Sequence, residues 1–459
     1  MTERFDDIVI GTGQAGPPLA VRLAQAGRRV AIVERDRFGG TCVNNGCTPT
    51  KTLVASAFAA QVARRAAEYG VLLEGGVRVD MRLVKARKDA IAQRASAGVE
   101  RWLRDTAGVT VLRGHARFDS PDKIRVEDRL LAAQRVFINV GGRPLVPSFP
   151  GIHEVPYLTN VSMMDLDVLP EHLVVIGGSY VGLEFAQMYR RFGAQVTVVE
   201  KLGRVVSRED PDVSDAIREV LESEGIRVET DANCIGFQPR AGRIGVHLDC
   251  GDGRREVVGT HVLVAVGRVP NTDGLGLDKA GVRTDARGYI VVDESLCTNV
   301  DGIYALGDCN GRGAFTHTAY NDYEIVADNL LDGAARRVGD RVMAYALYID
   351  PPLARVGMTD AEVRKSNRRA LTGMRPMTRV ARAVEKGETR GFVKVTVDAQ
   401  SEQILGAAIL GAGADEAVHC LIDAMHLEAR YTDVRRAMHI HPTLAELIPT
   451  VLQELKPLH

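Results

Sequence analysis

The sequence predicts an α/β fold built around two copies of one strand–helix–strand unit. Each copy has a short apolar strand, a glycine-rich turn, a helix, and a second apolar strand that ends on a glutamate. The first glycine of the turn precedes that glutamate by 23 positions in both copies. Two complete units with matched spacing predict a duplicated Rossmann-like dinucleotide-binding architecture far more strongly than one glycine motif does.

The first copy runs from the strand at residues 7–10 to the strand at residues 30–33, which leads into Glu34. Its turn carries the three glycines of the fingerprint, Gly11, Gly13 and Gly16. These glycines allow a tight turn and close approach of a phosphate, and the helix N-terminus favours negative charge. The glutamate is placed to accept hydrogen bonds from a ribose.

The second copy runs from the strand at residues 173–176 to the strand at 196–199, with Gly177 and Gly182 in its turn and Glu200 at its end. Ser179 stands where the middle glycine is expected. Two sites on one chain indicate two different dinucleotides, a tightly held flavin and a diffusing nicotinamide. Glu200 favours NADH because it repels a 2′-phosphate, although Lys201 and Arg204 lie close enough to keep NADPH open.

Two cysteines follow the first unit at once. Cys42 and Cys47 are separated by four residues, and Gly46 allows the tight loop that a disulfide between them needs. Thr48 and Pro49 predict the N-cap and the first residue of a helix, which places Cys47 at the positive end of that helix and stabilises its thiolate. The pattern suggests a redox pair, while a structural disulfide or a metal site remains open at this point.

Composition limits the other classes of function. The 459 residues are 45% hydrophobic and 25% charged, with a formal net charge of -1, so no global field attracts nucleic acid or an anionic membrane. No apolar run reaches the roughly 18 residues that a membrane helix needs. Seven cysteines are too few and too scattered for a secreted disulfide framework. The expected location is the cytoplasm, with no nucleic-acid or membrane partner.

Six segments together resemble the class I pyridine nucleotide-disulfide oxidoreductases, a family that includes dihydrolipoamide dehydrogenase, glutathione reductase and mercuric reductase. Besides the two glycine fingerprints, the segments are GGTCVNNGCTPTK at 39–51, GHARF at 114–118, VGGRP at 140–144, VGRVPN at 266–271, TNVDGIYALGD at 298–308 and HIHPTLAE at 439–446. The resemblance implies FAD and NADH or NADPH as cofactors and a homodimer. It also implies an FAD domain at 1–148, an NAD(P) domain at 149–270, the rest of the FAD domain at 271–340, and an α+β dimerisation domain at 341–459.

The resemblance also assigns roles to single residues. Electrons are expected to pass from NAD(P)H through FAD to the disulfide of Cys42 and Cys47, with Cys47 facing the flavin and Cys42 meeting the substrate. Lys51 lies one helical turn after Cys47, and Glu184 resembles the family's glutamate near the nicotinamide. Each is otherwise an exposed helix charge. Tyr180 matches a tyrosine lid over the flavin in some members, or is ordinary packing.

His441 is the expected acid–base group, oriented by Glu446 and acting on the cysteines of the other subunit. The rival interpretation is a capping box in which Glu446 and Thr443 only begin a helix. No metal site is expected, because the polar residues at 419–426 are better explained as one helix face. The residues expected to bind the cofactors are Gly11, Gly13, Gly16, Glu34, Thr41, Lys51, Ala116, Gly142, Gly177, Tyr180, Gly182, Glu200, Gly267 and Asp308.

The sequence contains features of more than one branch of this family. The segments 177–200 and 345–363 are similar to mercuric-reductase-like sequences, but residues 451–459 lack the C-terminal cysteine pair of those enzymes. We therefore expect an NAD(P)H-dependent disulfide reductase whose substrate is a small disulfide, a thiol or a metal ion. The alternatives are a mercuric reductase, the dihydrolipoamide dehydrogenase subunit of a 2-oxoacid dehydrogenase complex, and a redox sensor.

Overall fold

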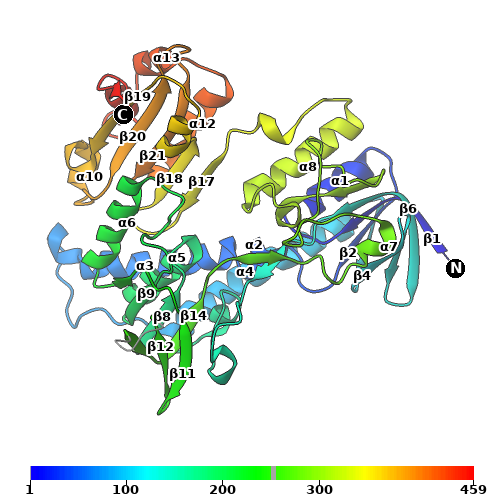
Figure 1. Cartoon of the computed structure of the whole chain (residues 1–459), viewed down its shortest axis with the longest axis horizontal. Coiled ribbons are helices and arrows are strands. Elements are labelled where there is room, and N and C mark those ends of the chain that lie inside the picture. Colours follow the sequence, from blue (N-terminus) through cyan, green and yellow to red (C-terminus); the bar gives the residue numbers. More distant parts are fainter. Residues whose placement is uncertain (1, 250–254, 459) are drawn as a thin grey trace.

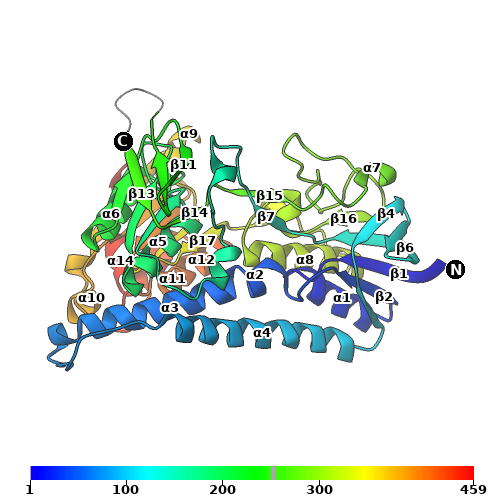
Figure 2. The ribbon, with the colours of Figure 1, turned by 90° about the horizontal axis from the view of Figure 1, so that it is seen from below.

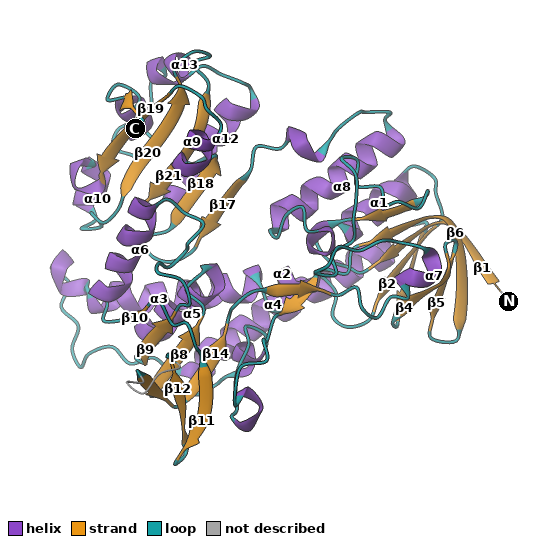
Figure 3. Cartoon of the chain, viewed as in Figure 1, coloured by secondary structure: helices purple, strands orange, loops and turns teal. Residues whose placement is uncertain are grey.

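The computed structural model describes residues 2–249 and 255–458, arranged in three sheet-based lobes (Figure 1; Figure 3). The first lobe is a seven-stranded sheet of order β3-β2-β1-β6-β5-β4, with β16 paired to β6. Its strands are β1 (Thr2–Ile10), β2 (Val30–Glu34), β3 (Val109–Arg113), β4 (Ala116–Ser120), β5 (Lys123–Val126), β6 (Arg129–Ile138) and β16 (Ile303–Ala305). Because β16 pairs with β6 in parallel, the chain returns to this sheet after building the second lobe.

The second lobe is a parallel sheet of order β10-β9-β8-β14 beside a small antiparallel sheet. Its strands are β8 (His172–Ile176), β9 (Gln195–Val199), β10 (Arg227–Glu229), β14 (His261–Val264), β11 (Gly236–Arg240), β12 (Arg243–His247) and β13 (Glu256–Gly259). The chain leaves and re-enters the first lobe through an antiparallel ribbon of β7 (Gly142–Pro144) and β15 (Arg268–Pro270). The domain limits at 148, 270 and 340 stay a prediction.

The third lobe is an antiparallel sheet of order β17-β18-β21-β20-β19-β22. Its strands are β17 (Ala344–Leu347), β18 (Leu353–Gly357), β19 (Ala370–Pro376), β20 (Phe392–Asp398), β21 (Ile404–Leu410) and β22 (Lys456–Pro457). Short helices surround the sheet: α9 (Asp360–Lys365), α10 (Ala381–Glu385), α11 (Ala414–Ala417), α12 (His419–His426), α13 (Tyr431–Arg436) and α14 (Leu447–Val451).

The helices of the first two lobes are α1 (Gly16–Gln25), α2 (Gly40–Asn44), α3 (Cys47–Arg64), α4 (Met81–Asp105), α5 (Tyr180–Phe192), α6 (Pro211–Ser223), α7 (Leu277–Ala280) and α8 (Thr316–Leu331). Figure 2 shows α3 and α4 side by side along one face, and α3 also contacts α5 of the second lobe. This arrangement carries the start of α3 to the junction between lobes.

The predicted start of the cysteine helix is wrong by two residues. The expected first residue was Pro49 after an N-cap at Thr48, but α3 begins at Cys47 with Gly46 at the N-cap. The Gly46 carbonyl accepts the first helical hydrogen bond, from the Thr50 backbone N–H (3.0 Å), so Thr48 already lies inside the helix. Cys42 lies on the short helix α2 rather than in an open loop. Cys47 still lies in the first helical turn, where the peptide dipoles favour a thiolate.

The fold class predicted from the sequence is confirmed by these sheets. The strands β2 and β8 and the last three residues of β1 are mostly apolar and buried, as is typical of the inner strands of a covered parallel sheet. In the described residues 2–249 and 255–458, no helix is long and apolar enough to cross a membrane.

Candidate active site

The two glycine-rich turns have the same backbone geometry. Gly11 has φ of +100° and Gly177 has φ of +111°, in the region that favours glycine. A Cβ on Gly16 would lie 2.2 Å from the carbonyl oxygen of Gly11, and one on Gly182 would lie 2.0 Å from that of Gly177. Each helix therefore approaches its strand so closely that no side chain fits between them.

The glutamate at the end of each second strand folds back onto its turn in the same way. Glu34 Oε2 accepts a hydrogen bond from the backbone N–H of Thr12 (2.9 Å), and Glu200 Oε2 accepts one from that of Gly178 (2.6 Å). In both copies Oε1 of the glutamate accepts a hydrogen bond from a backbone N–H two residues further along the chain, that of Asp36 or of Leu202. The duplication read from the sequence therefore extends to the hydrogen bonds of the carboxylates.

A cavity of about 470 Å³ lies between the first glycine turn, the cysteines and the start of α5. Most of the predicted site residues line it: Gly11, Gly13, Glu34, Thr41, Cys42, Cys47, Lys51, Ala116, Gly142, Tyr180, Glu184 and Asp308. The predicted residues outside its lining are Gly16, Gly177, Gly182, Glu200, Gly267, His441 and Glu446. The residues predicted to face the flavin and those predicted to carry the redox chemistry thus share one cavity, whereas the second turn lies next to it.

The cavity fits a flavin dinucleotide. A Cβ on Gly13 would lie 2.8 Å from Asn139 Oδ1, and a Cβ on Gly40 would lie 2.8 Å from the Cα of Gly13, so glycines keep this wall open. Asp308 lines the same cavity, and burial raises the pKa of its carboxyl even though Arg268 lies 3.6 Å away. A partly buried carboxyl that faces a cavity is suited to bind a ligand hydroxyl group.

Cys42 and Cys47 are free thiols with opposite protonation tendencies. The Cys42 thiol donates to Cys47, and this bond is the largest of the causes that lower the pKa of Cys47 to about 6. Thr316, whose hydroxyl lies 3.2 Å from the Cys47 sulfur, and the Lys51 ammonium lower it further, against burial and Glu184. The same bond and burial raise the pKa of Cys42. Cys47 is therefore the thiolate of the pair at neutral pH.

Lys51 and Glu184 form an ion pair across two lobes. Lys51 Nζ lies 2.9 Å and 2.8 Å from the two carboxylate oxygens of Glu184. Glu184 also accepts from the backbone N–H of Tyr348 (2.9 Å), and the Tyr348 ring centroid lies 4.5 Å from Lys51 Nζ. Residues of all three lobes therefore meet beside the cysteines.

His441 and Glu446 are also in contact. His441 Nδ1 lies 3.0 Å and 2.9 Å from the two oxygens of Glu446. The Glu446 backbone N–H donates to Thr443 Oγ1 (3.2 Å), but α14 begins only at Leu447, and the Glu446 side chain binds the histidine. The His441 side chain is 72% exposed. Figure 1 shows α13, just before this segment, far from α2, the helix that contains Cys42.

Sequence reasoning missed four residues of the site. Thr316 touches Cys47, and Tyr348 covers the Lys51–Glu184 pair, but neither follows a local motif. Asn139 joins the first turn to the return strand, since its Oδ1 accepts from Gly16 N (3.0 Å) and its Nδ2 donates to Leu306 O (2.9 Å). A polar residue directly after the apolar end of β6 was a usable signal for it. The fourth residue, Glu209, contacts Tyr180.

Two family models match the chain. Residues 5–322 match the model of pyridine nucleotide-disulphide oxidoreductases, and residues 343–452 match the dimerisation domain of the same family. The chain belongs to this family. The match confirms the resemblance seen in the sequence, and the dimerisation domain supports a homodimer.

The relatives include several activities within the family. A dihydrolipoyl dehydrogenase of Thermus scotoductus is 34% identical over 445 residues, covering 96% of this chain and 95% of the relative. A mercuric reductase of Streptomyces lividans is 33% identical, with 98% and 96% covered. The Cu(II) complex of the HOCl-induced flavoprotein disulfide reductase RclA of Escherichia coli has a TM-score of 0.90 at 32% identity, with 99% of both chains covered.

These similarities confirm the expected class of enzyme. The chain is a pyridine nucleotide-disulfide oxidoreductase that acts on a sulfur group, from an FAD-dependent family that uses NADH or NADPH. The family match also explains why one cavity is lined by both the first glycine-rich turn and the cysteine pair.

Proposed function

We propose that this enzyme uses NADH to reduce a small disulfide through Cys42 and Cys47. The observation that carries the proposal is the Cys47 sulfur, held as a thiolate inside the cavity by Cys42, Thr316 and Lys51. FAD, when bound, would supply the hydride and electron-transfer chemistry between NADH and the Cys42–Cys47 disulfide. Gly13, Asn139 and Asp308 are the residues suited to hold the flavin.

Reduction of the acceptor disulfide then requires only the two cysteine thiols and one acid–base group. The Cys42 thiolate attacks the acceptor disulfide, which releases one thiolate and forms a mixed disulfide. The Cys47 thiolate then attacks Cys42, which releases the second thiolate and restores the Cys42–Cys47 disulfide. His441 takes the proton from Cys42 and returns it to the leaving thiolate, while Glu446 orients the ring. The reducing cytoplasm suits this dithiol chemistry.

His441 serves the second subunit in this proposal. Its side chain is exposed and lies outside the cysteine cavity of its own chain. Met438 (98% exposed) and Ile440 (79% exposed) flank it with apolar surface that a second copy can cover. The dimerisation domain provides the symmetry for such an exchange.

Glu200 supports NADH over NADPH. Its carboxylate closes the second turn at the place where a ribose is bound in such folds, and a 2′-phosphate there would meet a negative charge. Lys201 and Arg204 are exposed, and Arg204 lies 3.8 Å from Asp215, which partly neutralises it.

A thiophilic metal ion is the second candidate acceptor. Two adjacent sulfur ligands favour soft metals, one relative is a mercuric reductase, and the RclA structure is a Cu(II) complex. The deciding experiment is an anaerobic NADH titration of the FAD-loaded enzyme, followed by turnover with linear disulfides, a cyclic dithiolane, Hg(II) and Cu(II). A long-wavelength thiolate–flavin band with turnover of a disulfide supports the proposal. Turnover of the metal ions alone, or no band, contradicts it.

A further inference from the structure

The carboxyl of Asp308 reaches the cavity from a short 3₁₀ turn at Gly307–Asn310. Asn139 holds one side of this turn: its Nδ2 donates to the carbonyl of Leu306 (2.9 Å) and would lie 2.9 Å from a Cβ on Gly307. The turn therefore packs closely against the same residue that binds the first glycine turn.

Asp322, on helix α8, holds the other side of the turn. Its Oδ2 accepts hydrogen bonds from the backbone N–H of Gly307 (2.7 Å) and from Nδ2 of Asn310 (2.9 Å). These two donors belong to the first and the last residue of the turn, and Asp322 is only 2% exposed. One carboxylate oxygen thus fixes both ends of the segment that carries Asp308.

The second oxygen of Asp322 binds Arg341, in the segment that leads into β17 of the third lobe. Arg341 Nη2 donates to Asp322 Oδ1, and Arg341 Nε donates to Asn321 Oδ1 (2.7 Å). The Arg341 side chain is 8% exposed, and Asp322 is its only carboxylate partner among residues 2–249 and 255–458. The carboxylate therefore cannot leave the turn without also leaving a buried positive charge unpaired, which is costly.

A carboxylate is the side-chain group that satisfies both sides of this site. Donors face it from the turn, through Gly307 and Asn310, and from the third lobe, through Arg341. An amide has one accepting oxygen and one donating nitrogen, so an asparagine here would have to turn its nitrogen toward donors on one side. Because the site is buried, the donors left without an acceptor are not compensated by bulk water.

We infer that Asp322 is a positioning residue for the FAD site, and that Arg341 keeps its carboxylate aligned with the turn that carries Asp308. The inference rests on the proposed function in one respect, namely that FAD occupies the cavity. Among the described residues, Asp308 and Asn139 line the cavity and Asp322 does not, so Asp322 acts through the turn. A turn that is no longer held must be ordered when FAD binds, and this lowers the affinity for FAD.

The test measures the dissociation constant of FAD for the full-length holoenzyme by equilibrium ultrafiltration. D322N leaves buried donors without an acceptor, so we expect about ten- to hundredfold weaker binding. R341M leaves Oδ2 of Asp322 on the turn and removes only the group that aligns it, so we expect a smaller loss of about two- to tenfold. The visible circular dichroism of the remaining bound FAD should change in D322N, because the spectrum reports the surroundings of the flavin.

The double variant D322N/R341M tests the role of Arg341. Without the guanidinium, the asparagine can direct its oxygen to Gly307 and Asn310 while its nitrogen no longer faces a donor from the third lobe. The double variant should therefore bind FAD as tightly as D322N or more tightly. If it binds FAD more weakly than D322N, the two residues act independently, and the inference is overturned.

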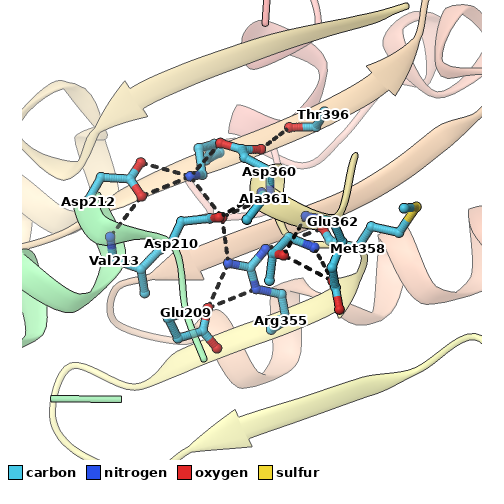
Figure 4. A network of polar contacts seen from close by, with 12 residues as sticks. Glu209, Asp210, Asp212, Val213, Arg355, Met358, Asp360, Ala361, Glu362 and Thr396 are labelled. Atoms are coloured by element: carbon cyan, nitrogen blue, oxygen red, sulfur yellow. Dashed lines mark hydrogen bonds and ion pairs between the residues drawn. The ribbon is translucent and has the colours of Figure 1, made fainter. Parts of the chain in front are cut away.

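The control removes a buried charge from another contact between lobes. The Lys394 side chain is 5% exposed and lies 2.9 Å from Asp360 and 2.8 Å from Asp212, in the polar network between the second and third lobes (Figure 4). K394M should lower the temperature of unfolding, because it leaves these carboxylates unpaired, and should leave the affinity for FAD unchanged.

The outcomes separate the inference from the proposed function. Weak FAD binding in D322N together with wild-type affinity in K394M supports the inference. Equal losses in D322N and K394M would show a general effect of loosened lobes and overturn it, as would wild-type affinity and an unchanged flavin spectrum in D322N. If the wild-type chain itself binds no FAD, the proposed function fails and the inference fails with it.

Discussion

Lys51 and Glu184 lie 133 positions apart in the chain, yet the Lys51 ammonium is within 2.9 Å of both oxygens of the Glu184 carboxylate. The two charges act on the Cys47 sulfur with opposite sign: Lys51 lowers the pKa of the thiol, and Glu184 raises it. The balance between these two charges therefore influences the pKa of the Cys47 thiol. Its two members should be separable by experiment.

We expect K51M and E184Q to move the Cys47 titration in opposite directions. The thiolate–flavin band of the two-electron-reduced enzyme should be present above a midpoint near pH 6 and disappear as the pH falls through it, since only the thiolate gives the band. K51M removes a stabilising cation and should raise the midpoint by about one pH unit, whereas E184Q should lower it. K85M, a lysine paired to Asp89 on α4, is the control. Equal shifts in one direction would contradict this electrostatic account.

The hydrogen bond that the Cys42 thiol donates to Cys47 should shift the pH midpoint of the same thiolate–flavin band. C42S keeps a hydroxyl donor, whereas C42A removes the largest cause of the lowered pKa of Cys47. The midpoint should therefore lie clearly higher in C42A than in C42S, by about one unit. C47S should abolish the band. A full-strength band in C47S would show that another group faces the flavin.

Complementation should reveal where His441 acts. We expect H441A and C47S each to lose turnover of the disulfide acceptor, while H441A keeps flavin reduction by NADH. A purified heterodimer of the two variants contains one site with both residues intact if the histidine serves the other subunit, so about half of the wild-type activity should return. If His441 serves its own chain, the heterodimer stays inactive.

The nucleotide preference should respond to charge at the end of β9. E200A removes the carboxylate expected to repel a 2′-phosphate, so kcat/KM for NADPH relative to NADH should rise roughly tenfold, the scale of one lost charged hydrogen bond. R204A removes a cation from the same loop and should shift the ratio the opposite way. If the ratio of kcat/KM for NADPH to that for NADH stays unchanged in both variants, the adenosine ribose does not bind beside Glu200.

Two glycine-to-alanine substitutions should have opposite effects on stability. G182A places a Cβ 2.0 Å from the carbonyl oxygen of Gly177 and should lower the free energy of unfolding by about 1–3 kcal/mol or more. Gly98 lies on the exposed face of α4, and the Cβ of G98A would have no neighbour within 4 Å. The better helix propensity of alanine should therefore raise the free energy of unfolding by about 0.5–1 kcal/mol. Denaturant unfolding of the two variants checks both values.

The fold class, the duplicated nucleotide units and the cysteine pair could be predicted from the sequence, because these features depend on local spacing. A glycine turn, a strand period and a helix start all depend on residues within about 25 positions of each other, such as Gly11 and Glu34. The exact start of α3 was missed by two residues, since backbone hydrogen bonds at Gly46 outweighed the preference of Pro49 for the first position.

The distant groups that surround the cysteines could not be predicted from the sequence, because they meet only when the three lobes pack together. Thr316 reaches Cys47 because α8 returns to the first lobe, and Tyr348 and Glu209 reach the site because the third lobe packs on the second. Such contacts depend on how sheets and helices pack across more than a hundred residues, and no local pattern encodes that geometry. The protonation of Cys47 and the contact of Tyr180 with Glu209 therefore depend on how the lobes pack together.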